Sequence, residues 1–149
     1  MDKRTRVLNA MNKKEVDHVP VGFWFHFAGE EASGEGCIKA HLKYYRETDL
    51  DFVKIMCDGY FPYPLPEIRE AADWKTLQPL TADHPFIREQ VERAKAIVDD
   101  IGKERCVFYN VFAPFSSLRF GAEAVGLSDA DVMEYIRTCL LYTSDAADD

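Results

Sequence analysis

The feature of this sequence that most constrains its fold is the alternation of short apolar runs with longer segments in which apolar residues recur at helical spacing. Three apolar runs are typical of buried strands, at residues 19–25, 52–57 and 106–112. Helical spacing occurs at residues 3–11, 35–47, 83–101, 115–125 and from 128 onward. Strands that alternate with helices and read as continuous apolar runs pair in parallel, with both faces covered. The sequence therefore predicts an α/β architecture.

Several of these predicted helices carry terminal signals. Asp2 is placed to cap the first helix. The long central helix opens at Asp83, and Pro85 is tolerated in its first turn. Ser128 and Asp131 have the spacing of a capping box, in which each side chain bonds the backbone of the other residue.

Asp58 is the strongest candidate site residue. It ends the apolar run 52–57 and precedes Gly59 and a proline-rich loop. A carboxylate at the carboxyl end of a buried strand, before a loop with few free backbone donors, has the position of a catalytic residue in an α/β barrel. Two other interpretations stay open: Asp58 and Gly59 form a hairpin turn, or Asp58 bonds its own loop backbone in an Asx turn.

Other candidates surround the same predicted strand ends. His26 ends the first predicted strand and would act as a proton donor or ligand, although its position favours a loop histidine bonded to backbone. Trp24 would form an apolar wall, or else fill the core as any strand residue does. Tyr60 would belong to a lid over the site, or to a surface loop without function. Cys57 would point away from Asp58 and into the core, because successive strand residues face opposite ways.

A closed α/β barrel needs about 250 residues, whereas this chain has 149. We therefore expect an incomplete TIM (β/α)8 barrel in residues 1–138, with an N-terminal helix and the first three or so βα units. Residues 139–149 turn small and acidic and resemble a translated adapter sequence, so we expect an artefactual or disordered tail. A genuine acidic terminus is the alternative.

Composition limits the partners that the chain can have. The formal net charge is −8, with 26 acidic and 18 basic residues, which disfavours nucleic acid because a polyanion would be repelled. The four cysteines are scattered and lack metal-ligand spacing, so buried thiols in a reducing compartment are expected rather than disulfides. No apolar stretch approaches the length of a membrane span. We expect a cytoplasmic protein with neither a nucleic-acid nor a membrane partner.

Four segments together resemble the opening of the uroporphyrinogen decarboxylase (URO-D) superfamily, over about residues 2–137. They are Arg-Thr-Arg-Val-Leu-Asn-Ala at 4–10, Asp-His-Val-Pro-Val at 17–21, the strand that ends in Asp58, and Phe-Ala-Pro-Phe-Ser at 112–116. The superfamily includes decarboxylases of haem biosynthesis and corrinoid-linked methyltransferases, and its fold is a (β/α)8 barrel. The resemblance implies that Asp58 matches the aspartate that contacts substrate pyrrole NH groups and stabilises the protonated intermediate. A carboxylate suits that role because these NH groups only donate and the intermediate is cationic.

Two departures from the decarboxylase pattern change the expected substrate. After their first strand the decarboxylases carry an Arg-Gln-Ala-Gly-Arg type segment that binds substrate carboxylates, whereas residues 23–31 here contain no arginine. After the third strand the family's Gly-Ala-Pro-Trp-Thr segment leads to a tyrosine that assists the aspartate. Here the corresponding segment contains Phe115 and leads to Phe120, which cannot donate a hydrogen bond. These differences favour the methyltransferase-like branch, in which zinc held by His and Cys of later barrel units activates a thiol.

The expected function is therefore that of a URO-D-family enzyme acting on a tetrapyrrole or corrinoid-related substrate. A corrinoid methyltransferase-like member is slightly favoured over a true decarboxylase of porphyrin biosynthesis, and an inactive truncated fragment is the third alternative. The expected partners are a small-molecule tetrapyrrole or a corrinoid protein, and the resemblance implies a homodimer for the full-length enzyme. No cofactor is expected within this segment, and zinc only in a full-length methyltransferase-like protein. The expected site residues are Asp58 and His26 for catalysis and Trp24, Tyr60, Phe115 and Phe120 for substrate binding.

Overall fold

The computed structural model describes residues 1–56, 64, 73, 76, 78–124, 126–135 and 137. The chain divides into two compact units, of which the first comprises Met1–Tyr60 and Ile87–Val111 and the second Phe61–Phe86 and Phe112–Asp149. The predictions for Asp58, Tyr60, Cys57 and residues 139–149 lie outside the described residues.

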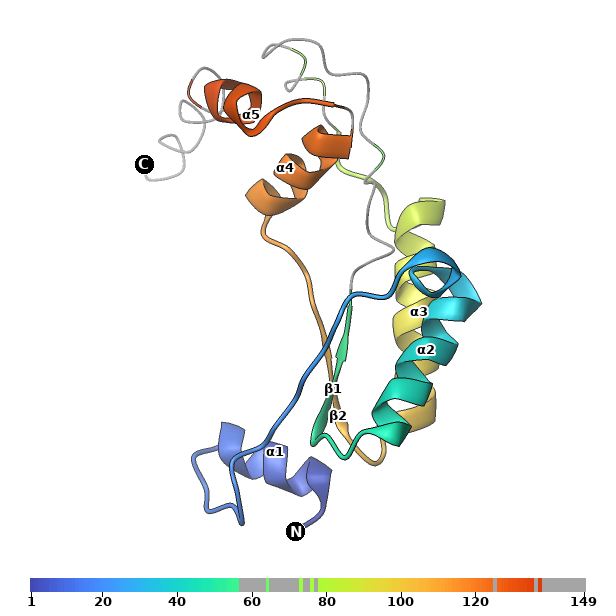
Figure 1. The fold of residues 1–149 in the computed structure, drawn as a ribbon, viewed down its shortest axis with the longest axis vertical. Coiled ribbons are helices and arrows are strands. Elements are labelled where there is room, and N and C mark those ends of the chain that lie inside the picture. The colour runs from blue at the N-terminus through green and yellow to red at the C-terminus, as the bar shows by residue number, and fades with distance from the viewer. Residues whose placement is uncertain are drawn as a thin grey trace. The chain divides into compact units, whose positions relative to one another are not determined.

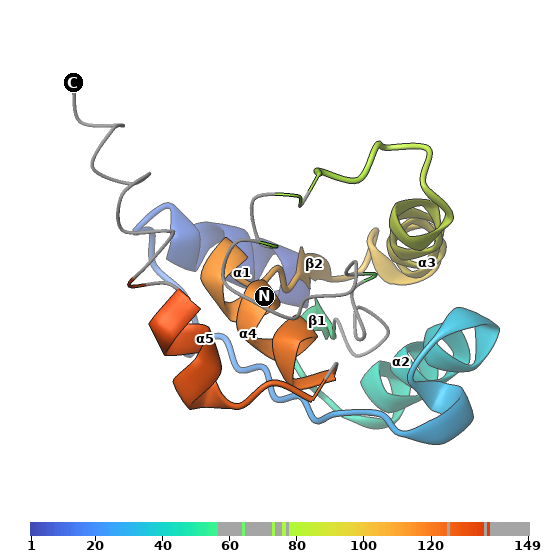
Figure 2. The same cartoon turned by 90° about the horizontal axis from the view of Figure 1, so that it is seen from above.

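The first unit is built on a parallel pair of strands, β1 (Phe52–Ile55) and β2 (Cys106–Tyr109). Parallel strands need a crossover connection, and α3 (Pro85–Ile101) lies on the path between them. Figures 1 and 2 show α2 and α3 on one side of the strand pair. The described part of the chain is therefore mixed α/β with a two-stranded parallel sheet, and the barrel stays a prediction.

The core of the first unit lies between the strands and these helices. The helix α2 (Gly34–Glu47) follows a short 3-10 helix, η1 (Gly29–Glu31). Each fully buried aliphatic side chain contributes about 1.5–3 kcal/mol through removal of apolar surface from water. The buried cluster that joins α2, β1 and α3 consists of Tyr45, Leu50, Val53, Ile55, Ile97 and Ile101.

The N-terminal helix α1 (Lys3–Met11) has the bounds that its periodicity predicts. Its predicted cap is confirmed, because the Thr5 N–H donates to Asp2 Oδ1 at 2.8 Å. Figure 1 shows α1 at the end of the strand pair where both strands begin. Arg4 Nη1 donates to Gly102 O at 3.0 Å, which ties α1 to the connection that leads into β2.

The prediction of a strand at residues 19–25 is wrong, since none of these residues belongs to a strand. The segment runs extended beside β1, and the Asp51 N–H donates to Val21 O at 2.8 Å. The Val21 N–H, however, donates to Asp51 Oδ2 at 2.8 Å and not to a strand carbonyl. Pro20 has no N–H to offer. These two losses explain why a backbone ladder does not form.

The other predicted strands are shorter than their apolar runs, and the predicted helices are largely confirmed. The long central helix begins at Pro85 and not at Asp83, and it ends just before Gly102. Cys37 and Cys106 are buried and form no disulfide. Within the described ranges, no helix has both the length and the apolar character that crossing a membrane requires.

The second unit contains α4 (Pro114–Ala124) and α5 (Asp129–Tyr135). The predicted capping box is confirmed: the Ser128 N–H donates to Asp131 Oδ2 at 2.8 Å, and the Asp131 N–H donates to Ser128 Oγ at 3.2 Å. Arg119 joins the two helices with bonds of 2.7 and 2.6 Å to Asp129. Arg119 thus links the two helices at the surface, and Ala122 of α4 and Val132 of α5 are buried.

Candidate functional site

The strand face opposite α2 and α3 carries the first group of candidate residues. Alternate strand residues point to opposite faces, and Val53 and Ile55 are buried on the helix side. Phe52 and Lys54 therefore point to the other side, which we call the open face. Phe52 packs edge-on against Phe108 of β2, with ring centroids 5.3 Å apart and planes at 82°. Phe108 is 37% exposed, so elements of the described chain leave this face partly uncovered.

Lys54 and Trp24 form a close pair on the open face. The Lys54 ammonium lies 3.5 Å from the centroid of the Trp24 ring, a cation–π contact. Trp24 comes from the extended segment and is 49% exposed. A contact of this kind at a partly exposed position contributes about 0.5–1 kcal/mol. Sequence analysis singled out Trp24 and missed Lys54. The signal that could have identified Lys54 is a charged residue at an alternate position of an apolar strand.

The backbone of Lys54 is held by the phenol of Tyr45 on α2. The Lys54 N–H donates to Tyr45 Oη at 2.9 Å, and the Tyr45 hydroxyl donates to Lys54 O at 3.0 Å. Burial raises the pKa of Tyr45 above its usual range, so the phenol keeps the proton that this double role requires. The helix thereby fixes the strand position from which Lys54 projects.

The remaining predicted site residues are placed as follows. His26 is exposed and stands next to Phe27, which is buried and packs on the His41 ring at 4.6 Å between centroids. In the second unit, Phe115 lies in the first turn of α4. Phe120 is half-buried and packs against Phe112, with centroids 5.3 Å apart. The structure thus brings Trp24 to Lys54, a residue that the sequence analysis did not single out.

His41 is a buried histidine that the sequence analysis did not consider. Its Nδ1 lies 2.8 Å from Cys37 O, and its Nε2 accepts from the Met56 N–H at 3.0 Å. A ring that donates through Nδ1 and accepts through Nε2 is a neutral imidazole. His41 therefore ties α2 to the residue that follows β1, and its role is structural.

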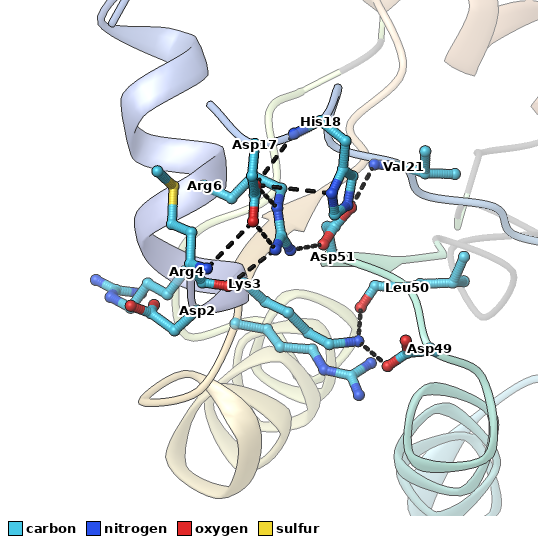
Figure 3. Close-up of polar contacts among 12 residues, drawn as sticks. Asp2, Lys3, Arg4, Arg6, Asp17, His18, Val21, Asp49, Leu50 and Asp51 are labelled. Carbon is cyan, nitrogen blue, oxygen red and sulfur yellow. Dashed lines mark hydrogen bonds and ion pairs between the residues drawn. The ribbon is translucent and has the colours of Figure 1, made fainter. Parts of the chain in front are cut away.

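An ionic network lies at the opposite end, where the strands begin (Figure 3). Arg6 on α1 donates from Nη1 to Asp51 Oδ1 at 2.5 Å. It also donates from Nε to Asp17 Oδ1 at 2.6 Å and from Nη2 to Asp17 Oδ2 at 2.9 Å. The N-terminal ammonium of Met1 lies 3.1 Å from the same Asp17 carboxylate. The exposed side chain of His18 lies at the edge of this network, with Nε2 3.5 Å from Asp51 Oδ2.

This network shifts the titration of both aspartates. Hydrogen bonds from the Arg6 guanidinium hold the pKa of Asp17 far below its usual range. Burial acts to raise the pKa of Asp51, but the Val21 N–H and the Arg6 guanidinium outweigh it and lower the pKa overall. Both carboxylates are therefore charged at neutral pH, and each is matched by a cation.

We interpret the Arg6 network as structural. Its residues line a hollow that carries both signs of charge, and they tie α1 to the residue that precedes β1. It also joins two of the segments on which the URO-D resemblance rests, since Arg6 belongs to 4–10 and Asp17 to 17–21. Part of the resemblance therefore lies in residues that connect α1 to the start of β1.

Neither metal-ligand groups among the described residues nor matches to known proteins add a functional residue to this site. Among the described residues, no group of three His, Cys, Asp or Glu side chains is arranged to hold a metal ion. No protein-family model, curated protein or solved structure matches the chain. The resemblance to the URO-D superfamily therefore rests on the sequence segments alone.

Proposed function

We propose that this chain is the N-terminal part of a URO-D-family enzyme that acts on a tetrapyrrole or corrinoid-related substrate beyond the carboxyl end of β1 and β2. The observation that carries the proposal is the parallel register of the two strands, from Phe52 opposite Cys106 to Ile55 opposite Tyr109. Parallel βαβ units place the residues that follow their strands at one edge of the sheet. That edge is where α/β barrels carry catalytic residues.

In this proposal the Asp58 carboxylate accepts hydrogen bonds from the substrate NH groups. It also stabilises the positive charge that develops during the reaction. His26 serves as a proton donor or ligand, the two roles that an imidazole commonly takes at such sites. Trp24, Tyr60, Phe115 and Phe120 supply apolar and aromatic contacts to a flat ring system.

A methyltransferase-like member is favoured over a porphyrinogen decarboxylase. The segment 23–31 has no arginine to form bidentate bonds with the many carboxylates of a porphyrinogen, and it carries Glu30 and Glu31. By the resemblance, Phe120 corresponds to the assisting tyrosine of the decarboxylases. The resemblance implies that a methyltransferase-like member would hold zinc through His and Cys side chains of later barrel units.

The test is an Asp58→Asn substitution in the protein encoded by the complete reading frame. Asparagine keeps the shape of the side chain and removes its charge, so turnover should fall about 100-fold or more while the protein stays folded. Two assays identify the branch: release of carbon dioxide from uroporphyrinogen, and methyl transfer between a methylated corrinoid protein and a thiol.

The matched control is Asp99→Asn, which removes an exposed aspartate of α3 and should leave turnover unchanged. Full turnover in the Asp58→Asn protein would remove the assigned role of Asp58. An intact wild-type protein inactive in both assays would overturn the proposed function itself.

A further inference from the structure

We propose that Lys54 is the anion-binding residue of this site and that its ammonium binds a carboxylate of the substrate on the open face. The inference deepens the proposed function, and it rests on that function for the tetrapyrrole-like identity of the substrate. The carboxylate preference itself rests on Lys54 and its surroundings.

The first observation is the position of Lys54. It lies in β1 between two residues buried at 0% and 1% exposure, Val53 and Ile55, and so it points to the opposite side of the sheet. Its strand neighbour on β2 is Phe108, which is partly exposed on the same face. A cation is thus placed among aromatic side chains on the face of the strand pair that points away from α2 and α3.

The second observation is how the charge is compensated. Within the described part of the chain, the ion pairs of the structure do not include Lys54, and its ammonium contacts the face of Trp24 at 3.5 Å. A cation–π contact engages one side of an ammonium and leaves N–H donors for another partner. A carboxylate is the partner that gives the stronger, charge-assisted bonds.

The third observation is preorganisation. Tyr45 Oη bonds both the N–H and the carbonyl of Lys54. Trp24 restrains the far end of the same side chain. Because a lysine held at both ends loses less conformational freedom when a ligand binds, this arrangement favours binding over a freely moving surface lysine.

The position also fits the predicted site. Lys54 belongs to β1, the strand whose carboxyl end precedes Asp58 in the sequence. The segment 23–31 lacks the arginines that bind several carboxylates, and Lys54 supplies one compact charge instead of a planar fork. We therefore infer a substrate with few carboxylates, one of which lies beside Trp24.

The experiment measures ligand binding to the 149-residue chain in a Trp74→Phe background, so that the emission of Trp24 reports on its surroundings. The probes are benzene-1,3,5-tricarboxylate and its uncharged analogue, benzene-1,3,5-tricarboxamide, titrated by calorimetry and by fluorescence. The chain has a net charge of −8, which disfavours unspecific binding of anions. The tricarboxylate should bind and quench or shift Trp24 emission, its affinity should fall with added salt, and the tricarboxamide should bind at least fivefold more weakly.

Four variants separate the charge of Lys54 from its packing. Lys54→Met and Lys54→Gln remove the charge and should weaken the tricarboxylate at least fivefold and remove the decrease of its affinity with added salt. Lys54→Arg should stay within about threefold of the wild type, because it keeps a cation. Lys43→Met removes an exposed lysine of α2 and should change nothing.

Equal tricarboxylate affinity in the wild type and both neutral variants would overturn the inference, as would the absence of binding to the wild type. Protoporphyrin IX, a dicarboxylate tetrapyrrole, is the last probe. If Lys54 governs the tricarboxylate but protoporphyrin IX does not bind, the carboxylate site stands and the tetrapyrrole part of the proposed function fails. If the affinity for the tricarboxylate does not depend on Lys54 while the intact enzyme turns over its substrate, only the present inference fails.

Discussion

At the scale of single residues, Arg93 on α3 has the most unusual surroundings in the described structure. Its side chain is 2% exposed, and the described residues offer it no carboxylate and no acceptor for Nε. The groups that accept from its terminal nitrogens are all neutral, namely Gln90 Oε1 at 2.5 Å, Tyr109 Oη at 3.3 Å, Ala32 O at 3.4 Å and Cys37 Sγ at 3.6 Å. A buried cation without an anion is costly to desolvate. Arg93 therefore connects elements without adding net stability.

This environment predicts the effect of Arg93→Met. Methionine fills a similar volume without a charge, and the Tyr109 hydroxyl still donates to Gln90 Oε1 at 3.1 Å. We expect the free energy of unfolding to rise by about 1 kcal/mol. Arg93→Lys keeps the charge but loses the planar fork, and it should cost about 2 kcal/mol. Urea unfolding measures both, and a methionine variant less stable than the lysine variant would contradict the argument.

At the scale of elements, the first turn of α2 is docked against η1 through Gly36. A Cβ added at Gly36 would lie 2.0 Å from Glu30 O and 2.9 Å from Glu30 C. Both atoms belong to the backbone, so neither can turn aside as the end of a side chain would. The close approach of the two elements therefore requires glycine at this position.

Gly36→Ala should destabilise the protein although it improves the helix. Alanine is favoured over glycine inside a helix by about 1 kcal/mol, while the backbone clash forces a shift that costs about 1–3 kcal/mol or more. We expect a net loss of about 1–2 kcal/mol in guanidinium chloride unfolding. Lys43→Ala, on an exposed position of the same helix, is the control and should stay within about 0.5 kcal/mol. An alanine variant at Gly36 as stable as the wild type would show that η1 is free to move.

The elements also show which structural features can be predicted from the sequence and which depend on the tertiary fold. The bounds of α1, the Asp2 cap and the Ser128 capping box follow from contacts between near neighbours in sequence, and each was predicted. The strand at 19–25 was predicted wrongly because its pairing is decided by Asp51, which is 30 positions from Val21. In the candidate site, Trp24 was predicted from its place in an apolar run. Its contact with Lys54, like that between Arg6 and Asp51 at a separation of 45 positions, depends on the tertiary fold.

At the scale of the whole molecule, the chain is acidic, and several of its carboxylates are paired with cations. The pKa of Asp17 is lowered by the Arg6 guanidinium, that of Asp49 by the Lys3 ammonium, and that of Asp129 by the Arg119 guanidinium. A carboxyl group whose pKa is lower in the folded state stays charged there while the unfolded chain already binds protons. Folding is therefore linked to pH through these ion pairs.

The sign of this linkage predicts acid sensitivity. The stabilisation is complete above the unfolded pKa, about 4 for aspartate, and it is lost progressively as pH falls toward the lower folded values. The free energy of unfolding, measured in urea between about pH 2.5 and 7, should be flat above about pH 5 and decrease below it. Asp17→Asn removes the carboxyl group with the strongest lowering and should give a lower plateau with a shallower acid slope. Asp99→Asn, at an exposed position of α3, should follow the wild-type curve. An Asp17→Asn curve with the same acid slope as the wild type would mean that the Arg6 network does not carry the pH dependence.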